Sequence, residues 1–560
     1  MKEIITPRGK VTLALDTVID ISRNNPLFHS AEAFSIDLTV PRIPNEKIFG
    51  YQYRIASASR AEPIEARFLL NGREQLCGSI EIISATYESY HLLLKGGRND
   101  FLFRFGKLKL RELVFGYEDF VPGVSPPFQP TDAQLQAQMV ATFSGGDFIC
   151  FPVYNGDTNT WINRWSFDQQ TFAMDVGGPR TPFLRIFRAL ERLFALKEYT
   201  VTENWFSVSA ERRNIVLYNN TNYGVCASFD IRYLFPDWTI GDFIREIEDY
   251  FPVSLFIDAR TRTVRILGDD EVVTAAPAGE LKQYLERDYE VVFNEKQAGF
   301  DLTCQLPDSD KSCEGEFDYL DQAYSAEVYT VRDLPLNCQA GAVYRVLSEG
   351  AYYRAEVTEN NLQWQLIGNA AMGVREGDGD ITREPKIYPM MTTTQLQHEE
   401  VTITQQYVGT KRVLVNFSLL VPYTQKASHL WTQDFRPMVY RGFVPASIAP
   451  DQVEAGYTFN GNHYPLANFV NRNVDGTAFG NQSFELCWEG LKGAQTIAFL
   501  EGADKINAKL LIPQPDLEKL DTAKVYALDG RAVLISEMVI HYCEGCHISV
   551  EAVLFALKNG

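Results

Sequence analysis

The stretch Phe229–Gly268 reads FDIRYLFPDWTIGDFIREIEDYFPVSLFIDARTRTVRILG and joins four signals of regular structure without an interruption. Its first six residues alternate between apolar and mostly polar side chains, which predicts a half-buried strand over 229–234. Pro236 and Asp237 break that strand, because this pair is typical of a turn. The chain therefore changes direction before it continues.

A helix follows the turn, and both its face and its ends are predicted. Thr239 can accept a hydrogen bond at the first helical turn, and Asp242 stands where the second member of a capping box belongs. The helix has to end before Pro252, because the residue before a proline disfavours helical geometry. Its apolar side chains recur at helical spacing and form one stripe: Ile240, Phe243, Ile244, Ile247 and Phe251.

A hairpin completes the unit. Apolar residues alternate over 253–257, residues 259–262 turn the chain, and the alternation returns over 264–266. The whole stretch therefore predicts a small helix-on-sheet module. None of its residues forms a pattern that is typical of catalysis.

This module resembles a segment of the tail hub, or tail-tip baseplate, proteins of tailed bacteriophages. The helical segment 182–205 before it is similar to the helix that precedes the module in that family. Further similar segments occur in order along most of the chain: NGREQLCGSIEIISATYESYHLLLKGG (71–97), GAVYRVLSEGAYYRAEV (341–357), LQWQLIG (362–368), SFELCWEGLKGA (483–494) and the final hairpins. The resemblance therefore rests on the order of structural patterns and not on an active-site motif.

The resemblance implies a structural virion protein. In the family such a protein forms a homotrimeric ring at the distal end of the tail, contacts the tail tube or a distal tail protein, and carries tail-tip, fibre or spike proteins. It implies tube-like β-barrel domains, passage of DNA through the ring, and a place at the tail tip after synthesis in the host cytoplasm. It implies no catalytic residue, no cofactor and no bound metal.

Composition agrees with a mainly β protein that has α+β insertions. The 560 residues are enough for about three to five domains. Apolar residues make up 45% and aromatic residues 12%, which favours buried cores and strands. A net charge of −20 argues against stable nucleic-acid binding, since tight binding to phosphates needs clustered cations. An acidic lumen is still compatible with transient passage of DNA. Its negative charge repels the phosphates and so keeps the DNA from binding to the wall.

The sequence shows no export or membrane signal. The N-terminus MKEIITPRGKVTLALDTVID lacks an apolar core of the kind found in secretory signals. No run of about 18 apolar residues predicts a membrane span. Dispersed cysteines in such a chain are typical of reduced thiols made in a cytoplasm. The nine are Cys77, Cys150, Cys226, Cys304, Cys313, Cys338, Cys487, Cys543 and Cys546.

We divide the chain into five segments. They are 1–115, an N-terminal β domain and part of a tube-like barrel; 116–181, an irregular arm or connection; 182–302, the α+β central module; 303–400, an acidic linker with a small β insert; and 401–560, a C-terminal β domain and second tube-like barrel part. The dipeptides Asn71-Gly72, Asp529-Gly530 and Glu544-Gly545 predict tight hairpin turns in the two β regions.

Finer expectations follow within these segments. We expect 182–200 to be a helix with a first-turn proline, Glu280–Tyr289 a short helix, and Val291–Leu302 a strand pair. Residues 369–400 are expected to be a polar linker and 440–480 extended loops. The expected core of the insert Tyr324–Gly368 is Val343, Tyr344, Val346, Tyr352, Tyr353 and Trp364.

One sequence motif, Cys-x-x-Cys-His, is typical of metal binding or haem attachment. It consists of Cys543, Cys546 and His547. The flanking residues are strand-like, and a two-strand clip supplies too few ligands, so a plain hairpin is the preferred interpretation. The acidic run Glu376–Asp380 resembles the start of a calcium loop, but its later positions depart from that pattern. A solvated linker is preferred there. No catalytic, cofactor-binding or metal-binding residue is predicted.

Two other classes of function stay open besides the hub. The aromatic content and the Asn- and Gly-rich loops also suit a receptor- or carbohydrate-binding tail protein. A β-rich hydrolase needs a carboxylate pair or another reactive motif, and none stands out. A contractile injection system uses the same kind of hub as a phage, and the sequence does not separate the two.

Overall fold

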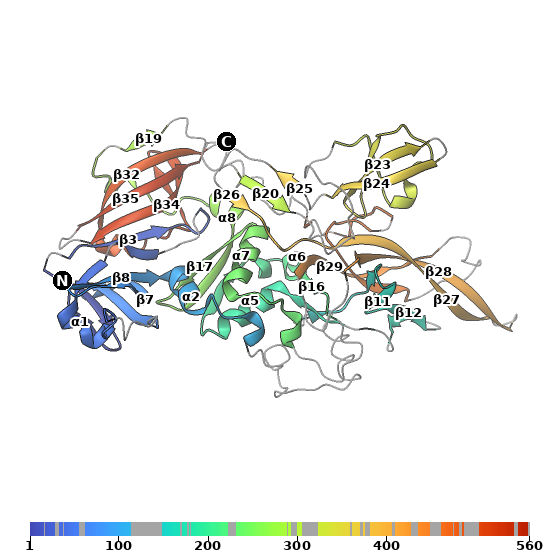
Figure 1. Ribbon diagram of the computed structural model, residues 1–560. Coiled ribbons are helices and arrows are strands. Elements are labelled where there is room, and N and C mark those ends of the chain that lie inside the picture. Colours follow the sequence, from blue (N-terminus) through green and yellow to red (C-terminus); the bar gives the residue numbers. More distant parts are fainter. Residues whose placement is uncertain are drawn as a thin grey trace.

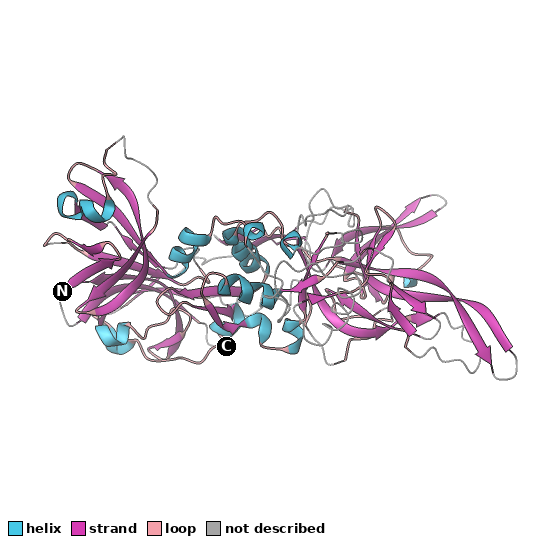
Figure 2. Cartoon of the chain, turned by 90° about the horizontal axis from the view of Figure 1, so that it is seen from below, coloured by secondary structure: helices cyan, strands magenta, loops and turns pink. Residues whose placement is uncertain are grey.

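The chain is mainly β and elongated in the computed structural model, with two β-rich ends and most of its helices between them (Figures 1 and 2). The structure describes residues 1–557 apart from 16, 29–32, 37, 55–61, 114–147, 169–170, 176–178, 180, 222–230, 288, 293–299, 305–322, 359–360, 370–372, 376–380, 406–408, 427–434, 449–460, 474, 481–483, 487–502 and 543–546. The predicted fold class is confirmed.

One sheet of 13 strands forms the first end and unites the beginning of the chain with its end. Its strands are β1 (Lys2–Thr6), β2 (Gly9–Val11), β3 (Ile19–Asn24), β4 (Ala33–Ile36), β5 (Leu38–Pro41), β6 (Ile64–Leu70), β7 (Arg73–Ala85), β8 (Ser89–Gly96), β19 (Glu290–Val292), β32 (Asp504–Pro513), β33 (Val525–Leu528), β34 (Arg531–Tyr542) and β35 (His547–Ala556). The junction is the antiparallel pair β3 and β34. The first and last β regions therefore share a sheet, while the five-segment division stays a prediction.

Two of the predicted hairpin turns are confirmed at the backbone. Asn71 and Gly72 have φ values of 52° and 77°, and they join β6 to β7. Asp529 and Gly530 have φ values of 51° and 80°, and they join β33 to β34. Positive φ at both central residues matches the right-handed twist of the two strands, which is why Asn-Gly and Asp-Gly predict such turns.

We expected residues 1–115 to form a β domain, but the described part of this segment also contains two short α-helices. Helix α1 (Arg42–Phe49) buries Asn45, Ile48 and Phe49 on one face. Helix α2 (Gly97–Phe105) begins directly after β8 and buries Phe101. Both helices are only two turns long, so their periodicity is too short to stand out against the strands around them.

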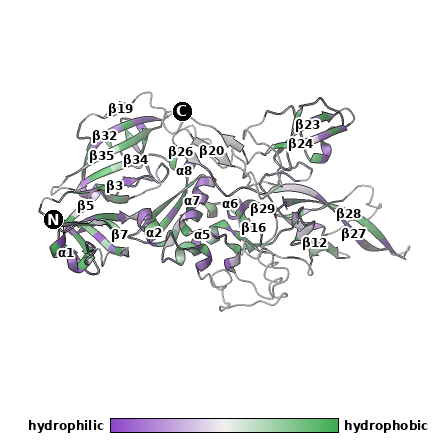
Figure 3. Ribbon diagram, viewed as in Figure 1, coloured by the Kyte–Doolittle hydropathy of each residue, from purple (hydrophilic) through white to green (hydrophobic). Residues whose placement is uncertain are grey.

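The helix-on-sheet module is confirmed. Helix α7 (Ile240–Tyr250) has a complete capping box between Thr239 and Asp242, and its whole apolar stripe is buried. Strands β17 (Val253–Asp258) and β18 (Thr263–Gly268) form the hairpin, and β15 (Thr200–Asn204) extends it to three strands. Figure 3 shows how hydrophobic and hydrophilic residues alternate around these central elements.

The strand predicted over 229–234 is wrong in its described part. Ile231–Leu234 is a 3-10 turn, η5. Leu234 at the end of this turn and the following Phe235 are both buried. Phe229 and Asp230 lie outside the described residues.

The helix predicted over 182–200 is shorter than expected. It is α5 (Ile186–Ala195), and Phe183–Arg185 is strand β14. That strand pairs with β16 (Ile215–Asn219) and β9 (Phe148–Ile149), so these partners take up its backbone groups before the helix begins. The six apolar residues of the predicted face are all buried even so: Phe183, Ile186, Phe187, Leu190, Leu193 and Phe194.

Two expectations at the end of the central module are wrong as well. The described part of Glu280–Tyr289 contains a 3-10 turn, η6 (Lys282–Tyr284), and no α-helix. Strands β19 and β20 (Phe300–Cys304) exist but do not pair with each other. Strand β19 joins β32 in the large sheet, whereas β20 joins β25 (Gly373–Arg375) and β26 (Ile381–Arg383). Partners that are distant in sequence decide the pairing.

The polar linker predicted over 369–400 is also a wrong prediction. Ile387, Tyr388 and Met390 are buried, and β27 (Met391–Gln405) pairs along its full length with β28 (Gly409–Thr424). The two strands form a long ribbon at the second end of the molecule (Figure 1). Threonine is β-branched and suits a strand, so the polar composition of β27 hid its structure.

The second end contains further sheets, partly in a region expected to be loops. Within 440–480, strands β29 (Phe435–Pro445) and β31 (His463–Asn468) are largely buried. The other strands here are β10 (Val153–Asn155), β11 (Thr160–Ile162), β12 (Trp165–Asp168), β13 (Thr171–Met174) and β30 (Ser447–Ile448). Tertiary packing overrides the Asn, Gly and Pro composition in this region.

The predicted β insert is confirmed as a sheet of four strands. They are β21 (Ala326–Val328), β22 (Val343–Val346), β23 (Ala351–Thr358) and β24 (Asn361–Asn369). Its predicted core is only partly right, because Val346 and Tyr352 are buried while Val343, Tyr344, Tyr353 and Trp364 are half-buried. A single sheet layer leaves much of its surface exposed to water.

Several expectations lie outside the described residues. They are most of the irregular arm 116–181, most of the acidic stretch after 303, the run Glu376–Asp380, the Glu544-Gly545 turn, and Cys226, Cys313, Cys487, Cys543 and Cys546. Cys77, Cys150 and Cys338 are free thiols.

Candidate functional site: an exposed tyrosine and arginine surface

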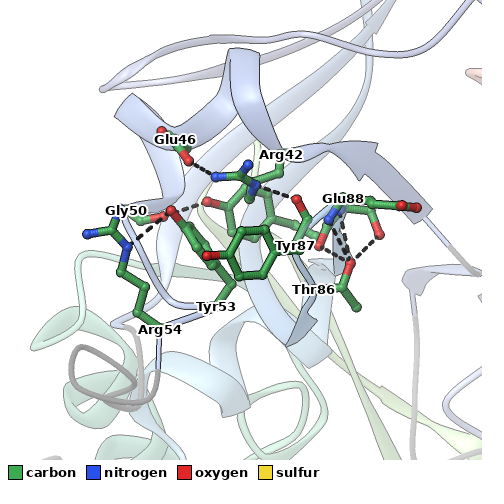
Figure 4. Close-up of polar contacts among 10 residues, drawn as sticks. Arg42, Glu46, Gly50, Tyr53, Arg54, Thr86, Tyr87 and Glu88 are labelled. Atoms are coloured by element: carbon green, nitrogen blue, oxygen red, sulfur yellow. Dashed lines mark hydrogen bonds and ion pairs between the residues drawn. The ribbon is translucent and has the colours of Figure 1, made fainter.

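A group of aromatic and guanidinium side chains lies at the surface of the first end of the molecule. It consists of Arg42, Tyr51, Tyr53, Arg54 and Tyr87, which we call the tyrosine–arginine patch. Figure 4 labels all of these residues except Tyr51. Its residues come from the start of α1, from the turn after α1, and from the β7–β8 turn. The patch therefore joins two segments that are more than thirty residues apart.

Backbone contacts fix the two turns that carry the patch. The Gly50 amide donates to the Glu46 carbonyl oxygen (2.8 Å), and Gly50 has a φ of 71°, which ends α1. The Gly50 carbonyl in turn accepts from the Tyr90 hydroxyl (2.5 Å). In the other turn, Thr86 Oγ1 accepts from the Glu88 amide (3.2 Å). Tyr87 is therefore held at the tip of a structured turn.

Arg42 ties the turns together. Its backbone amide donates to the Glu88 carbonyl (2.9 Å), and its Nε donates to the Tyr87 carbonyl (2.6 Å). The same guanidinium forms an ion pair with Glu46 one helical turn away. Its Cζ lies 4.5 Å from the centre of the Tyr53 ring and 5.3 Å from that of Tyr87. These distances are within the range of cation–π attraction.

A second guanidinium extends the stack. Arg54 Cζ lies 4.6 Å from the Tyr51 ring centre and 5.4 Å from that of Tyr53. The rings of Tyr53 and Tyr87 meet edge to face with centres 5.2 Å apart. Arg54 Nε also donates to the Tyr53 hydroxyl (3.1 Å), and this bond raises the pKa of Arg54. The contacts of the two arginines therefore hold the three tyrosine rings in place.

The patch is open to a binding partner. Tyr87 is 77% exposed and Tyr51 is 50% exposed, although the ordered stack restricts their side-chain freedom. Ile43 of α1 and Ile83 of β7 are 75% and 59% exposed. Tyrosine and arginine are enriched at the energetic centres of protein interfaces, because they combine apolar area with hydrogen bonding. The patch thus suits binding.

Sequence reasoning missed this patch. Tyr87 lies inside the segment 71–97 that resembles the hub family, but nothing local singles it out. The spacing Tyr51-x-Tyr53-Arg54 is the one local signal, and it is too short to be distinguished from chance. Only the fold brings the two segments together.

Two of the described histidines, His541 and His91, make pairwise contacts. His541 Nδ1 lies 3.0 Å from Asp20 Oδ1 across the β3–β34 pair, and His91 Nδ1 lies 3.0 Å from Thr39 Oγ1. His547 begins β35 and is exposed. Within the described ranges, no three His, Cys, Asp or Glu side chains are grouped as metal ligands would be. No described helix is both long and apolar enough to cross a membrane.

We compared the sequence and the structure of this mainly β chain with known proteins. No family model matches the sequence, and no curated protein matches it. Among solved structures, the chain is similar to the 43 kDa tail protein of prophage MuSo2 from Shewanella oneidensis. The alignment covers 99% of this chain and 95% of that one, with 9% identity and a TM-score of 0.29. A similarity at that TM-score carries no argument for a shared fold or function.

Proposed function

We propose that this protein is a structural protein of a bacteriophage virion, and more specifically the tail hub. As a homotrimer it forms a ring at the distal end of the tail, adapts the tail tube to the tip, and allows DNA to pass. The proposal is supported by the ordered sequence segments that resemble hub proteins, of which the helix-on-sheet module folds as expected. A threefold ring whose protomers each carry two tube-like parts matches the sixfold symmetry of a tube.

The observation that carries a structural role is the exposed tyrosine–arginine patch on the large sheet. A surface of this composition, with Tyr87 77% exposed, is expected to be covered in an assembly. In the proposed ring the patch contacts a neighbouring protein, either another copy or the tail tube or distal tail protein. Tail-tip, fibre or spike proteins bind elsewhere on the ring.

The proposed role involves no catalysis, cofactor or metal, and no stable binding of nucleic acid. The net charge of −20 makes the surface of a ring repel DNA at long range, which favours passage over retention. The protein is proposed to be made in the host cytoplasm and to end at the tail tip.

Assembly of purified protein with purified tail tubes tests the proposal. Sedimentation velocity should give a trimer, and electron microscopy should place it on the axis at one end of the tube. We expect Tyr87→Ala to weaken either the trimer or its attachment to the tube. Tyr329→Ala is a matched control, because Tyr329 is also exposed, at 56%, but lies beside the β insert. A folded monomer that never joins a tube would contradict the hub.

A receptor- or carbohydrate-binding tail protein is the second candidate. The exposed ring of Tyr87 favours it, because aromatic faces can stack on sugars. A glycan array would give defined sugar binding that is lost in Tyr87→Ala, and microscopy would place the protein at the tail periphery. The hub of a contractile injection system is a variant of the first proposal, and neighbouring genes decide between the two.

A further inference from the structure

A polar groove surrounds the tip of the β17–β18 hairpin. Residues 258–262 of this tip lie between the central module and the large sheet, with a cavity on either side. The cavities have volumes of about 340 Å³ and 420 Å³. Cys77, Ala259 and Arg260 line both of them, so we treat the two as one site and call it the Arg260 groove.

The charge of this groove is opposite to that of the chain. Eight different Lys and Arg side chains line the two cavities, against six Asp and Glu. The whole chain has 52 Lys and Arg against 72 Asp and Glu. A local excess of cations in so acidic a protein attracts anions to this place and away from the rest of the surface.

Most of the cations in the walls have acidic partners. Arg104 Nη2 lies 2.8 Å from Glu65 Oε1. Arg265 forms a two-point ion pair with Asp521, at 2.8 and 2.9 Å. These contacts hold the walls of the groove in position. They also show that the remaining cations are not needed for the fold in the same way.

Arg260 stands apart from these pairs. It is exposed at the hairpin tip, and its backbone amide donates to Asp258 Oδ1 (2.8 Å), which shapes the turn. Within the described part of the chain, no acceptor lies within hydrogen-bond distance of its guanidinium. Arg67 forms only a long ion pair, with Nη1 3.9 Å from Glu74 Oε2, and its side chain is 57% exposed. Both guanidinium groups line the first cavity and therefore have capacity for a ligand.

Asp100, Cys77 and Tyr199 also line the first cavity. Asp100 of α2 is fully buried, 3.7 Å from Arg104 Nη1, and burial raises the pKa of its carboxyl group. Burial also raises the pKa of Cys77 to about 11 and that of Tyr199 to about 12, so both are neutral at neutral pH. Among the charged side chains of the first cavity, cations therefore outnumber carboxylates.

We propose that the Arg260 groove binds an acidic segment of a neighbouring protein chain, whose carboxylates pair with Arg260 and Arg67. A protein segment fits better than a nucleic acid, because the acidic residues between the cations repel a continuous row of phosphates. A cavity of this size also accepts a few side chains at a time. The identity of the neighbour as a tail protein rests on the proposed function. The binding of carboxylates by the groove is independent of that function.

Calorimetric titration of the full-length protein with a hexaglutamate peptide at low salt tests the proposal. We expect saturable binding that weakens as salt is added, because exposed ion pairs are screened. Arg260→Ala should weaken binding by about tenfold, and removal of Arg67 in addition should weaken it further. Arg412→Ala is the matched control, since Arg412 is 74% exposed but lies on the distant β27–β28 ribbon. It should leave binding unchanged.

The same titration with inorganic phosphate and with a short single-stranded oligodeoxynucleotide separates the other sources of anions. Tighter binding of the oligonucleotide than of the peptide would overturn the assignment. So would absent peptide binding, or binding that Arg260→Ala and Arg412→Ala reduce equally. If the protein binds the peptide but never joins tail tubes, the hub proposal is wrong and the proposal that the Arg260 groove binds an acidic segment is retained.

Discussion

Substitution of Glu349 by Gln is predicted to stabilise the β insert at alkaline pH and to have almost no effect at acidic pH. Glu349 lies in the turn between β22 and β23 and is only 4% exposed. Tyr353 Oη donates to its Oε2 (2.9 Å). Burial nevertheless dominates and raises the pKa of Glu349 from 4.5 to about 7. The folded insert therefore prefers the protonated carboxyl group.

The size of the effect follows from the two pKa values. Below pH 4.5 the carboxyl group is protonated in both the folded and the unfolded state. Its ionisation therefore takes nothing from the free energy of unfolding there. As the pH rises from 4.5 to about 7, the unfolded state has released the proton while the folded state still holds it, so stability falls until the folded state is also deprotonated. The interval between the two values corresponds to about 3 kcal/mol at about 1.36 kcal/mol per pKa unit. Glutamine has the same shape and no charge.

Hydrogen–deuterium exchange of β22 and β23 measures this local stability, since a chain of this length does not unfold in one step. At pH 8 the Glu349→Gln variant should protect these amides up to about a hundredfold more than the unaltered protein, which corresponds to the same about 3 kcal/mol. At pH 4.5 the two should agree. Glu356→Gln is the control, because Glu356 is exposed on β23. Equal gains at both pH values, or a loss at pH 8, would refute the reasoning.

Three further substitutions test other contacts. Gly350→Ala should destabilise the docking of the insert by about 2 kcal/mol, because Gly350 has a φ of 61° and an added Cβ lies 2.7 Å from Val470 Cγ1; unchanged exchange in β23 would contradict this. Thr239→Ala should destabilise α7 by about 1 kcal/mol by removing its cap, and Thr239→Ser should restore it, as hydrogen–deuterium exchange of the α7 amides would show. Arg98→Met should weaken the contact between α2 and α7 by about 1.5–3 kcal/mol in the same assay, because it removes the two-point ion pair of Glu248, which is 12% exposed and also accepts from the Leu255 amide; unchanged exchange in α2 and α7 would contradict this.

The parts of the fold that could be predicted depend on neighbours in sequence. Helix α7 carries its cap, its apolar stripe and its terminating proline within fourteen residues. The Asn71-Gly72 and Asp529-Gly530 turns need only positive φ at adjacent residues. In each case a local steric or hydrogen-bond requirement selects the residue type, so the residue type predicts the structure.

The parts that failed depend on partners far away in sequence. Strand β27 is polar on its own, and it is a strand because β28 satisfies its backbone groups. Strand β20 finds β25 and β26 instead of its neighbour β19. The tyrosine–arginine patch forms because the Glu88 carbonyl binds Arg42 and so brings Tyr87 to Tyr53. No local pattern records such pairings.

The pairing of β3 with β34 has a consequence for synthesis on the ribosome. Residues 19–24 emerge early, but the strand at 531–542 that completes their hydrogen bonding is translated some five hundred residues later. During that interval a nascent chain displays a bare strand edge, which is a template for association with other nascent chains. Fragments that stop short of 531–542 are therefore expected to aggregate, and efficient production should depend on chaperones that shield this edge until translation ends.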